Sequence, residues 1–343
     1  MNLNTLFKKA TELKASDLHI IVGKPPILRI DGELKVIPDM PDVTREKAEE
    51  LVFSILTERQ KEKFIDEREL DISYEIPKFS RYRVNLHWEK DNVGLVARVI
   101  SNDVPALEDL GLPPIANEMI ERTSGLLLVT GPTGCGKSTT LAAMVEKINS
   151  IRFANIITLE DPIEYIHKPK KSIIKQRQLG NDMLSFDGAL RHVLRQDPNV
   201  IMVGEVRDLE TMSATITLAE TGHLVLATLH THNASQTIDR IIDVFPPHQQ
   251  AQVRLQLSIS LNGIISQQLL PKVGGGRIAA REILINTPAV ANIIRENKIP
   301  QIKSVIQTSA EEGMFSMEQN IKDLLQQGLI EETTALAYLN NLQ

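Results

Sequence analysis

Apolar and polar residues follow two different periods along the first hundred residues. Residues 2–14 and the segment after Thr44 carry the i, i+3, i+4 spacing of apolar positions that predicts helices. Residues 70–76 alternate with a period of two, which is typical of a half-buried strand. The pattern predicts a small α+β domain over residues 1–103, with further short strands at 18–22, 27–30, 34–37, 81–88 and 93–100.

A different pattern begins after residues 104–114, where Gly111 and three prolines indicate a connector. Beyond it, short apolar runs alternate with helical stretches, which predicts buried parallel strands in a three-layer α/β domain over residues 115–343. These runs lie at 126–130, 155–159, 200–203 and 224–228. From about residue 238 the pattern predicts a mostly helical region with one hairpin: helices at 249–261, 289–297, 316–327 and 331–341, and hairpin strands at 269–270 and 278–285.

Composition narrows the class of protein. The 343 residues include 38 Lys and Arg and 44 Asp and Glu, so the formal net charge is −6. This charge disfavours nucleic acid as a partner through a generally basic surface. The single cysteine excludes an internal disulfide and a multi-cysteine metal site. The first nine residues lack the apolar core of a signal peptide, and no apolar run approaches the roughly 20 residues that span a bilayer, so we expect a cytosolic protein.

A glycine-rich segment follows the first of these apolar runs. Gly131-Pro132-Thr133-Gly134-Cys135-Gly136-Lys137-Ser138 matches G-x-x-x-x-G-K-[ST], directly after an apolar strand and directly before a predicted helix. Glycines let backbone N–H groups turn inward at a helix N-terminus, where phosphate is favoured. Lys137 adds a full positive charge, and the Ser138 hydroxyl can ligate Mg²⁺. The segment predicts a nucleotide site formed by Gly131, Pro132, Thr133, Gly134, Cys135, Gly136, Lys137, Ser138 and Thr139.

Carboxylates that follow other predicted strands are candidates for metal binding and water activation. Glu205 comes just after the run 200–203, while Glu160, Asp161 and Glu164 follow the preceding run. Ligands bind at the carboxyl ends of strands in open α/β sheets, and two acidic clusters there can supply both roles. A solvated carboxylate or a helix cap is the alternative for each cluster.

Two histidines bracket the run 224–228. His223 precedes it and His230 follows it. An imidazole can hydrogen-bond a terminal phosphate and thereby report its presence, whereas a satisfied structural histidine is the alternative. No third ligand lies at a zinc-like spacing, so we reject a metal site at these histidines.

Together these segments resemble the secretion-superfamily motor ATPases, and within them the type IV pilus retraction ATPases (PilT-like). The resemblance extends over nearly the whole length. The phosphate loop is shared by many families, whereas the acidic segment, the atypical Walker B segment and the His box together are specific. Beyond the phosphate loop, the matching motifs are Ala15–His19, Pro25-Pro26 with Arg29–Gly32, Arg81–Asn85, the acidic segment Leu159–Tyr165, the Walker B segment Gly204–Thr211, the His box Thr221–Thr231, Ala234–Pro246 and Gly274–Arg277.

The resemblance implies a homohexamer whose subunits each have a PAS-like N-terminal domain and a RecA-like P-loop ATPase domain with C-terminal helices. ATP and Mg²⁺ would be bound between the two domains and completed by a neighbouring subunit. The implied roles are phosphate and Mg²⁺ binding by Lys137 and Ser138, metal support by Glu205 directly or through water, proton abstraction by Glu164, and nucleotide contact by His223 and His230.

Arginines of the N-terminal domain reach the γ-phosphate in this family, and the candidates here are Arg81, Arg83 and Arg98. An arginine stabilises the charge that develops during phosphoryl transfer, and strand alternation puts Arg81 and Arg83 on one face. A solvated arginine is the alternative. The resemblance further implies an inner-membrane pilus platform protein as partner, other pilus motor ATPases as further candidates, and a cytoplasmic position at the pilus base with membrane contact through partners only.

Two residues depart from the family pattern. Cys135 stands where serine is commoner, and a thiol near a helix N-terminus is either acidified and reactive or a silent replacement. Ala291 stands where the family's retraction-linked segment has an arginine, while Arg295 remains. The second departure bears on coupling to pilus movement more than on hydrolysis.

Other functions compete with pilus retraction. Pilus-extension and type II secretion ATPases usually carry a longer N-terminal region and a four-cysteine zinc segment, whereas this chain has one cysteine. An accessory retraction ATPase stays open. A nucleic-acid translocase would use the basic stretch from Lys168 to Arg177, for which a solvated loop is the other explanation. A non-catalytic regulatory subunit is disfavoured because all the expected phosphate-site residues are present.

Overall fold

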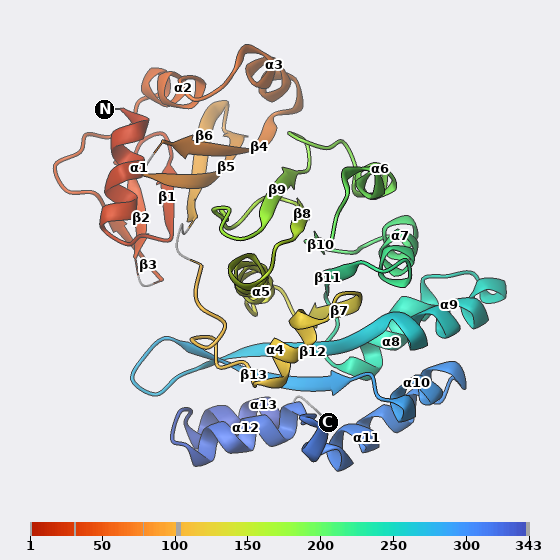
Figure 1. Cartoon of the computed structure of the whole chain (residues 1–343). Helices are drawn as coiled ribbons and strands as arrows, with labels where there is room; N and C mark the ends of the chain where they lie inside the picture. Colours follow the sequence, from red (N-terminus) through yellow and green to blue (C-terminus); the bar gives the residue numbers. More distant parts are fainter. Residues whose placement is uncertain (1, 31, 78, 101–103, 341–343) are drawn as a thin grey trace. The chain divides into compact units, whose positions relative to one another are not determined.

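The computed structural model describes residues 2–30, 32–77, 79–100 and 104–340 (Figure 1). The chain divides into two compact units. Unit 1 contains the described residues up to Ile100 together with Glu164–Ile166, and unit 2 contains Val104–Ile163 and the described residues from His167 onward. Each unit has its own sheet and hydrophobic core, so each follows from its own pattern of apolar residues.

The described part of unit 1 is built on a six-stranded antiparallel sheet in the order β3-β2-β1-β6-β5-β4. Burial alternates along β5, where Tyr82, Val84 and Leu86 are buried and the residues between them lie on the opposite face. The predicted strands are present with slightly different ends: β1 Asp17–Ile20, β2 Ile27–Ile30, β3 Glu33–Val36, β4 Glu69–Ile76, β5 Ser80–Glu89 and β6 Asn92–Ile100.

The helices of unit 1 are α1 (Leu3–Glu12), α2 (Arg45–Phe53) and α3 (Glu58–Glu67). The predicted cap of α2 is present, because the Thr44 side chain accepts a hydrogen bond from the Lys47 N–H. The apolar pattern did not predict α3, since Phe64 is the one residue of this helix that is buried. A capping box between Thr57 and Gln60 marks its start and was the available signal.

The described part of unit 2 is built on a seven-stranded sheet in the order β13-β12-β7-β11-β10-β8-β9. All neighbours are parallel except β12 and β13, which form an antiparallel hairpin. The central strands are buried on both faces, as their unbroken apolar runs predict. The strands are β7 Gly125–Thr130, β8 Asn155–Glu160, β9 Ile173–Gln178, β10 Val200–Val203, β11 Leu224–Leu229, β12 Leu261–Pro271 and β13 Arg277–Ile285.

Helices surround this sheet, and the C-terminal helices lie along the hairpin β12–β13 (Figure 1). Within the described residues, no helix combines the length and the apolar character needed to cross a membrane. The helices of unit 2 are α4 Ile115–Glu121, α5 Lys137–Ile151, α6 Phe186–Val193, α7 Leu209–Glu220, α8 Ala234–Asp243, α9 Pro247–Ser260, α10 Pro288–Arg295, α11 Ile302–Thr308, α12 Met317–Gln326 and α13 Glu332–Asn340.

Two strands of unit 2 differ from the sequence prediction. The basic stretch from Lys168 to Arg177 contains most of β9, an edge strand in which Lys175, Arg177 and two glutamines hide the strand pattern. The hairpin is present, but β12 extends back to Leu261, so the region after residue 238 is less helical than predicted. Asn341, predicted to end the last helix, lies outside the described residues.

Candidate nucleotide-binding site

The phosphate loop connects the end of β7 to the start of α5, as predicted. Gly131, Gly134 and Gly136 have φ values of +144°, +79° and +89°, a region that favours glycine. A Cβ on Gly131 would collide with the Gln267 carbonyl oxygen and the Cys135 Sγ, so this position also requires glycine for space. The sequence therefore forms the sharp turn that aims backbone N–H groups at an anion.

Lys137 is the first residue of α5, and its side chain folds over the loop. Its Nζ donates to the carbonyl oxygens of Gly131 at 2.7 Å and Pro132 at 3.0 Å. The residue is buried, which places a full positive charge inside the glycine turn. Ser138 follows in the first helical turn with an exposed side chain, so its hydroxyl is accessible to a ligand of the loop.

Glu205, Arg207 and His230 form a charged cluster at the same edge of the sheet. Glu205 follows β10 and His230 follows the neighbouring parallel strand β11. Glu205 Oε1 lies 3.0 Å from His230 Nε2, and Glu205 Oε2 accepts from an Arg207 guanidinium nitrogen at 2.7 Å. His230 Nδ1 also lies 3.4 Å from Thr133 Oγ1. The histidine thereby connects the phosphate loop to the carboxylate.

Electrostatics keep the Glu205 carboxylate ionised. Partial burial opposes ionisation, but the hydrogen bond and charge of Arg207 outweigh it, and the pKa of Glu205 is lowered. His230 and Lys137 contribute in the same direction. Arg207 is a residue to which sequence reasoning assigned no role; its position two residues after Glu205 was the available signal.

The donor set fits Mg²⁺. Magnesium prefers oxygen ligands and usually keeps several waters, and the Ser138 hydroxyl and the ionised Glu205 carboxylate supply such oxygens. Both Glu205 oxygens already have protein partners, which suits a carboxylate that acts on the metal through water. In the described ranges, no group of three or more His, Cys, Asp or Glu could hold a metal by itself, so phosphate oxygens and water would complete the shell.

His223 is not part of this cluster, and its predicted contact with the nucleotide stays a prediction that the strand positions disfavour. β11 runs parallel to β7, with Leu224 opposite Gly125 and Leu229 opposite Thr130. His223 therefore lies at the sheet edge opposite the phosphate loop, about 20 Å from His230 at the usual rise per residue of a strand. Its Nδ1 lies 3.1 Å from the Leu218 carbonyl oxygen, the partner of a structural histidine.

The three candidate arginines lie on one face of the unit 1 sheet. Arg83 on β5 is directly opposite Arg98 on β6, and Arg81 is two residues away on β5. Arg98 is opposite Asp17 on β1, and its Nε donates to Asp17 Oδ1 at 3.0 Å. Asp17 is opposite Arg29 in turn, so a charged row crosses the sheet. Sequence reasoning gave Asp17 no role, although it lies in a motif of the resemblance.

The acidic segment divides between structural and accessible groups. Glu160 is buried and accepts from Thr158 Oγ1 at 2.6 Å and Gln176 Nε2 at 3.1 Å, so it stabilises the end of β8. Asp161 contributes to raising the pKa of Arg207, after the larger effect of Glu205. Glu164 is exposed and belongs to unit 1, and its role as general base stays a prediction.

Cys135 is buried beneath the loop, and burial raises the pKa of its thiol despite the opposing charge of Lys137. A neutral, buried thiol is a poor nucleophile, which favours the silent replacement over the reactive one.

Ala291 is also buried, on α10 beside the core residues Val290 and Ile294, whereas Arg295 is exposed at the end of that helix. A small side chain at position 291 thus continues the core-facing side of α10.

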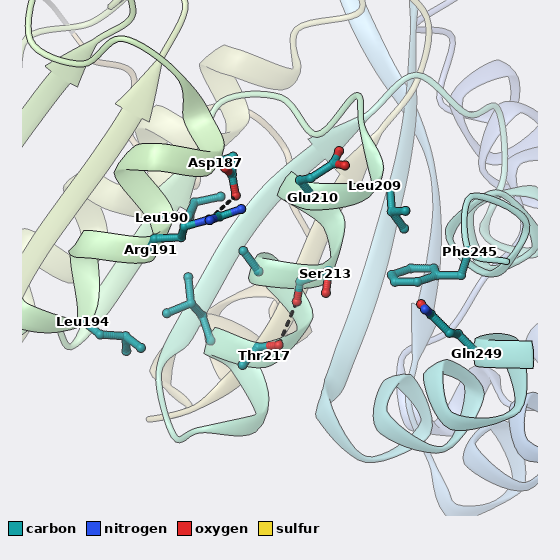
Figure 2. Close-up of a pocket in the computed structure, with 12 residues that line it drawn as sticks. Asp187, Leu190, Arg191, Leu194, Leu209, Glu210, Ser213, Thr217, Phe245 and Gln249 are labelled. Carbon is teal, nitrogen blue, oxygen red and sulfur yellow. Dashed lines mark hydrogen bonds and ion pairs between the residues drawn. The ribbon is translucent and has the colours of Figure 1, made fainter.

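A separate cavity of about 410 Å³ lies between α6, α7 and the start of α9 (Figure 2). Leucines and Phe245 line much of it, and an ion pair joins Asp187 to Arg191 at its edge with a distance of 2.8 Å. None of the residues predicted to bind or cleave nucleotide lines this cavity. The chemistry described above therefore resides at the phosphate loop.

Comparison with known proteins agrees with this site. A family model described as type II/IV secretion system protein matches residues 2–303. The type IV pilus retraction ATPase PilT of Pseudomonas aeruginosa is 44% identical over 335 residues, which cover 98% of this chain and 97% of that protein. The type IV pilus ATPase PilU of the same organism is 40% identical over 342 residues, 99% of this chain and 89% of PilU. A crystal structure of the pilus retraction motor PilT with bound ADP superposes with a TM-score of 0.93 at 46% identity, covering 98% of this chain and 96% of that one.

Fold and site define the class as a P-loop ATPase, and the matched model spans most of the sequence. The chain belongs to the type II/IV secretion system protein family. Within this family it is a PilT-like ATPase, so the predicted resemblance, the α/β fold class and the ATPase assignment are confirmed.

Proposed function

We propose that this chain hydrolyses ATP to power the retraction of a type IV pilus. The observation that carries the proposal is the cluster of Lys137, Glu205 and His230 at one sheet edge, in a chain that matches PilT over nearly its whole length. Retraction would produce the twitching motility after which another relative, from Neisseria gonorrhoeae and 48% identical over 306 residues, is named.

Each site residue has a role in this reaction. Lys137 and the loop N–H groups bind the β- and γ-phosphates, and Ser138 and Glu205 hold Mg²⁺, which when bound neutralises phosphate charge. Glu164 accepts a proton from the attacking water, since its side chain is exposed and a water molecule can reach it. His230 stands between Thr133 and Glu205, where it detects whether the terminal phosphate is present. His223, at the other sheet edge, has no place in this proposal.

Assembly completes the site in this proposal. The motor is a homohexamer with a PAS-like domain over residues 1–103, a connector over 104–114 and a RecA-like domain over 115–343. The charged row that contains Arg81, Arg83 and Arg98 supplies an arginine to the γ-phosphate, where it offsets charge in the transition state. The ring acts on an inner-membrane platform protein at the cytoplasmic base of the pilus and works beside other pilus motor ATPases.

Mg²⁺-dependent ATP hydrolysis by the purified chain tests the enzymatic part. We expect Lys137→Ala to lower the rate at least about 100-fold, because the loop loses the charge that faces the developing phosphate charge. A Lys137→Ala protein that is folded and hydrolyses ATP at the wild-type rate would contradict the proposal. The net charge of −6 predicts that added DNA leaves the rate unchanged, and stimulation by DNA would favour a translocase.

Fibre retraction in cells with and without this chain tests the motor part. Loss of retraction in the deletion strain, restored by wild-type protein and not by Lys137→Ala, is the expected result. The similarity to PilU supports a second candidate, an accessory retraction ATPase. That candidate predicts that deletion weakens retraction while a principal motor sustains it.

A further inference from the structure

Gln267 on β12 contacts both ends of the phosphate loop, although it lies more than a hundred positions further along the chain. Its side chain is buried, with 1% of the residue exposed. The amide oxygen accepts from Thr140 Oγ1 at 2.9 Å, and the amide nitrogen donates to the Cys135 carbonyl oxygen at 2.8 Å. One side chain thereby links the loop backbone to the first turns of α5.

The backbone of Gln267 constrains the beginning of the same loop. Its carbonyl oxygen occupies the space that a Cβ on Gly131 would need. At the other end, a Cβ on Gly136 would lie 3.4 Å from the Gln267 amide nitrogen. A single position of β12 therefore lies against both the first and the last glycine of the loop.

The hydrogen bond from the Gln267 amide nitrogen to the Cys135 carbonyl oxygen determines the direction in which the Gly136 N–H points. In a planar trans peptide, the carbonyl and the following N–H point in opposite directions. Because the Cys135 carbonyl points at Gln267, the N–H of Gly136 points away from it. This N–H is one of the backbone donors of the anion nest that the loop forms. Rotation of this peptide would present a carbonyl oxygen to a phosphate in place of a donor.

We propose that Gln267 is a positioning residue that holds the Cys135–Gly136 peptide in the orientation that binds phosphate. The inference rests on the proposed nucleotide site and adds a residue to it that the sequence motif does not contain. Its action passes through the loop backbone, since its side-chain partners are Thr140 and Cys135. Without Gln267, the Gly136 N–H would no longer be held in the direction that binds phosphate, and the affinity of the loop for the nucleotide phosphates would fall.

A neighbouring hydrogen bond provides a matched control. Thr130 Oγ1 donates to Ser266 Oγ at 2.9 Å, and both residues are fully buried. This bond joins β12 to the neighbouring strand β7, and it involves no residue of the glycine turn. Ser266→Ala should therefore lower stability by a similar hydrogen-bond loss without altering the loop.

The experiment compares Mg²⁺-ADP binding by full-length wild type, Gln267→Leu, Gln267→Glu and Ser266→Ala, using calorimetry, with the thermal midpoint of each protein as the measure of stability. We expect Gln267→Leu to raise the Kd for Mg²⁺-ADP about tenfold, because the misoriented Gly136 N–H would no longer donate a hydrogen bond to the phosphate. Ser266→Ala should change the Kd less than about twofold. Gln267→Glu keeps the acceptor for Thr140 and removes the donor to Cys135, so it should weaken ADP binding at least as much as Gln267→Leu.

Equal Kd values for Gln267→Leu and Ser266→Ala would overturn the inference, as would wild-type affinity in either Gln267 variant. If Gln267→Leu does not fold, Gln267→Met, a neutral and flexible side chain that also removes both hydrogen bonds, decides the question without adding a charge near the phosphates. A wild-type protein that fails to bind Mg²⁺-ADP would instead overturn the proposed function. The two failures are therefore distinguishable.

Discussion

The two sheets of this protein position charged residues in different ways. In the parallel sheet of unit 2, the residues of the site come from loops at the carboxyl ends of β7, β10 and β11, so that Thr133, Glu205 and His230 meet at one edge. In the antiparallel sheet of unit 1, charged residues sit within the strands, and Arg29, Asp17, Arg98 and Arg83 form a row across one face.

The difference follows from how each sheet is buried. A parallel strand covered on both faces has no position for a charge in its interior, so charges collect where the strand ends. An antiparallel strand with one open face can carry a charge at every second position. The parallel sheet therefore forms a concentrated site, and the antiparallel sheet an extended charged surface.

The largest expected effect comes from replacing, one at a time, the two histidines that bracket β11. His230→Ala removes the bridge between Thr133 and Glu205, and we expect kcat for ATP hydrolysis to fall about 10- to 100-fold. His223→Ala changes the same residue type at the opposite edge and should leave kcat within about twofold. Steady-state ATPase assays of both variants measure the difference, and equal losses would show that position at the carboxyl edge does not decide function.

A smaller effect is expected from Asp17 in the charged row. Asp17→Ala removes hydrogen bonds from Ser16 Oγ at 2.8 Å and Arg98 Nε at 3.0 Å, and the free energy of unfolding should fall by about 1–2 kcal/mol. Arg98→Ala is the control, because 67% of the Arg98 side chain is exposed and such a residue contributes at most about 1 kcal/mol. Urea unfolding monitored by circular dichroism gives both values; a larger loss for Arg98→Ala would contradict this ordering.

The smallest expected effect is on the pH dependence of stability. It concerns the partly buried hydrogen bond between His167 and Glu146 in unit 2, which contrasts with the charged row across the sheet face of unit 1. Burial lowers the pKa of His167 below 6.5, although its hydrogen bond to Glu146 at 2.9 Å opposes this shift and Lys170 adds to it. The unfolded chain therefore takes up a proton more readily, and the free energy of unfolding should decrease as pH falls below about 6.5. His167→Gln should flatten this dependence in urea unfolding at a series of pH values. A slope identical to that of wild type would show that His167 is not the titrating group.

Local chemistry explains which parts of the site could be predicted. The phosphate loop is contiguous, and the glycines at 131, 134 and 136 are required by backbone angles that the residue type itself allows. The strand before it and the helix after it follow from apolar spacing. Arg207 and Asp17 lay inside recognised motifs, yet their ion pairs depend on side-chain rotamers and on strand register, which neither motif specifies.

The amino-acid sequence by itself determined the α/β class of unit 2, the phosphate loop, and the likeness to pilus retraction ATPases, because these depend on residue order and short-range periodicity. Tertiary structure decided that His223 and His230 lie at opposite edges, that β9 is a strand, and that Gln267 supports a loop formed by residues far from it in the chain. Those facts depend on which strands pair and in what register, and such pairing is fixed by the burial of the whole core.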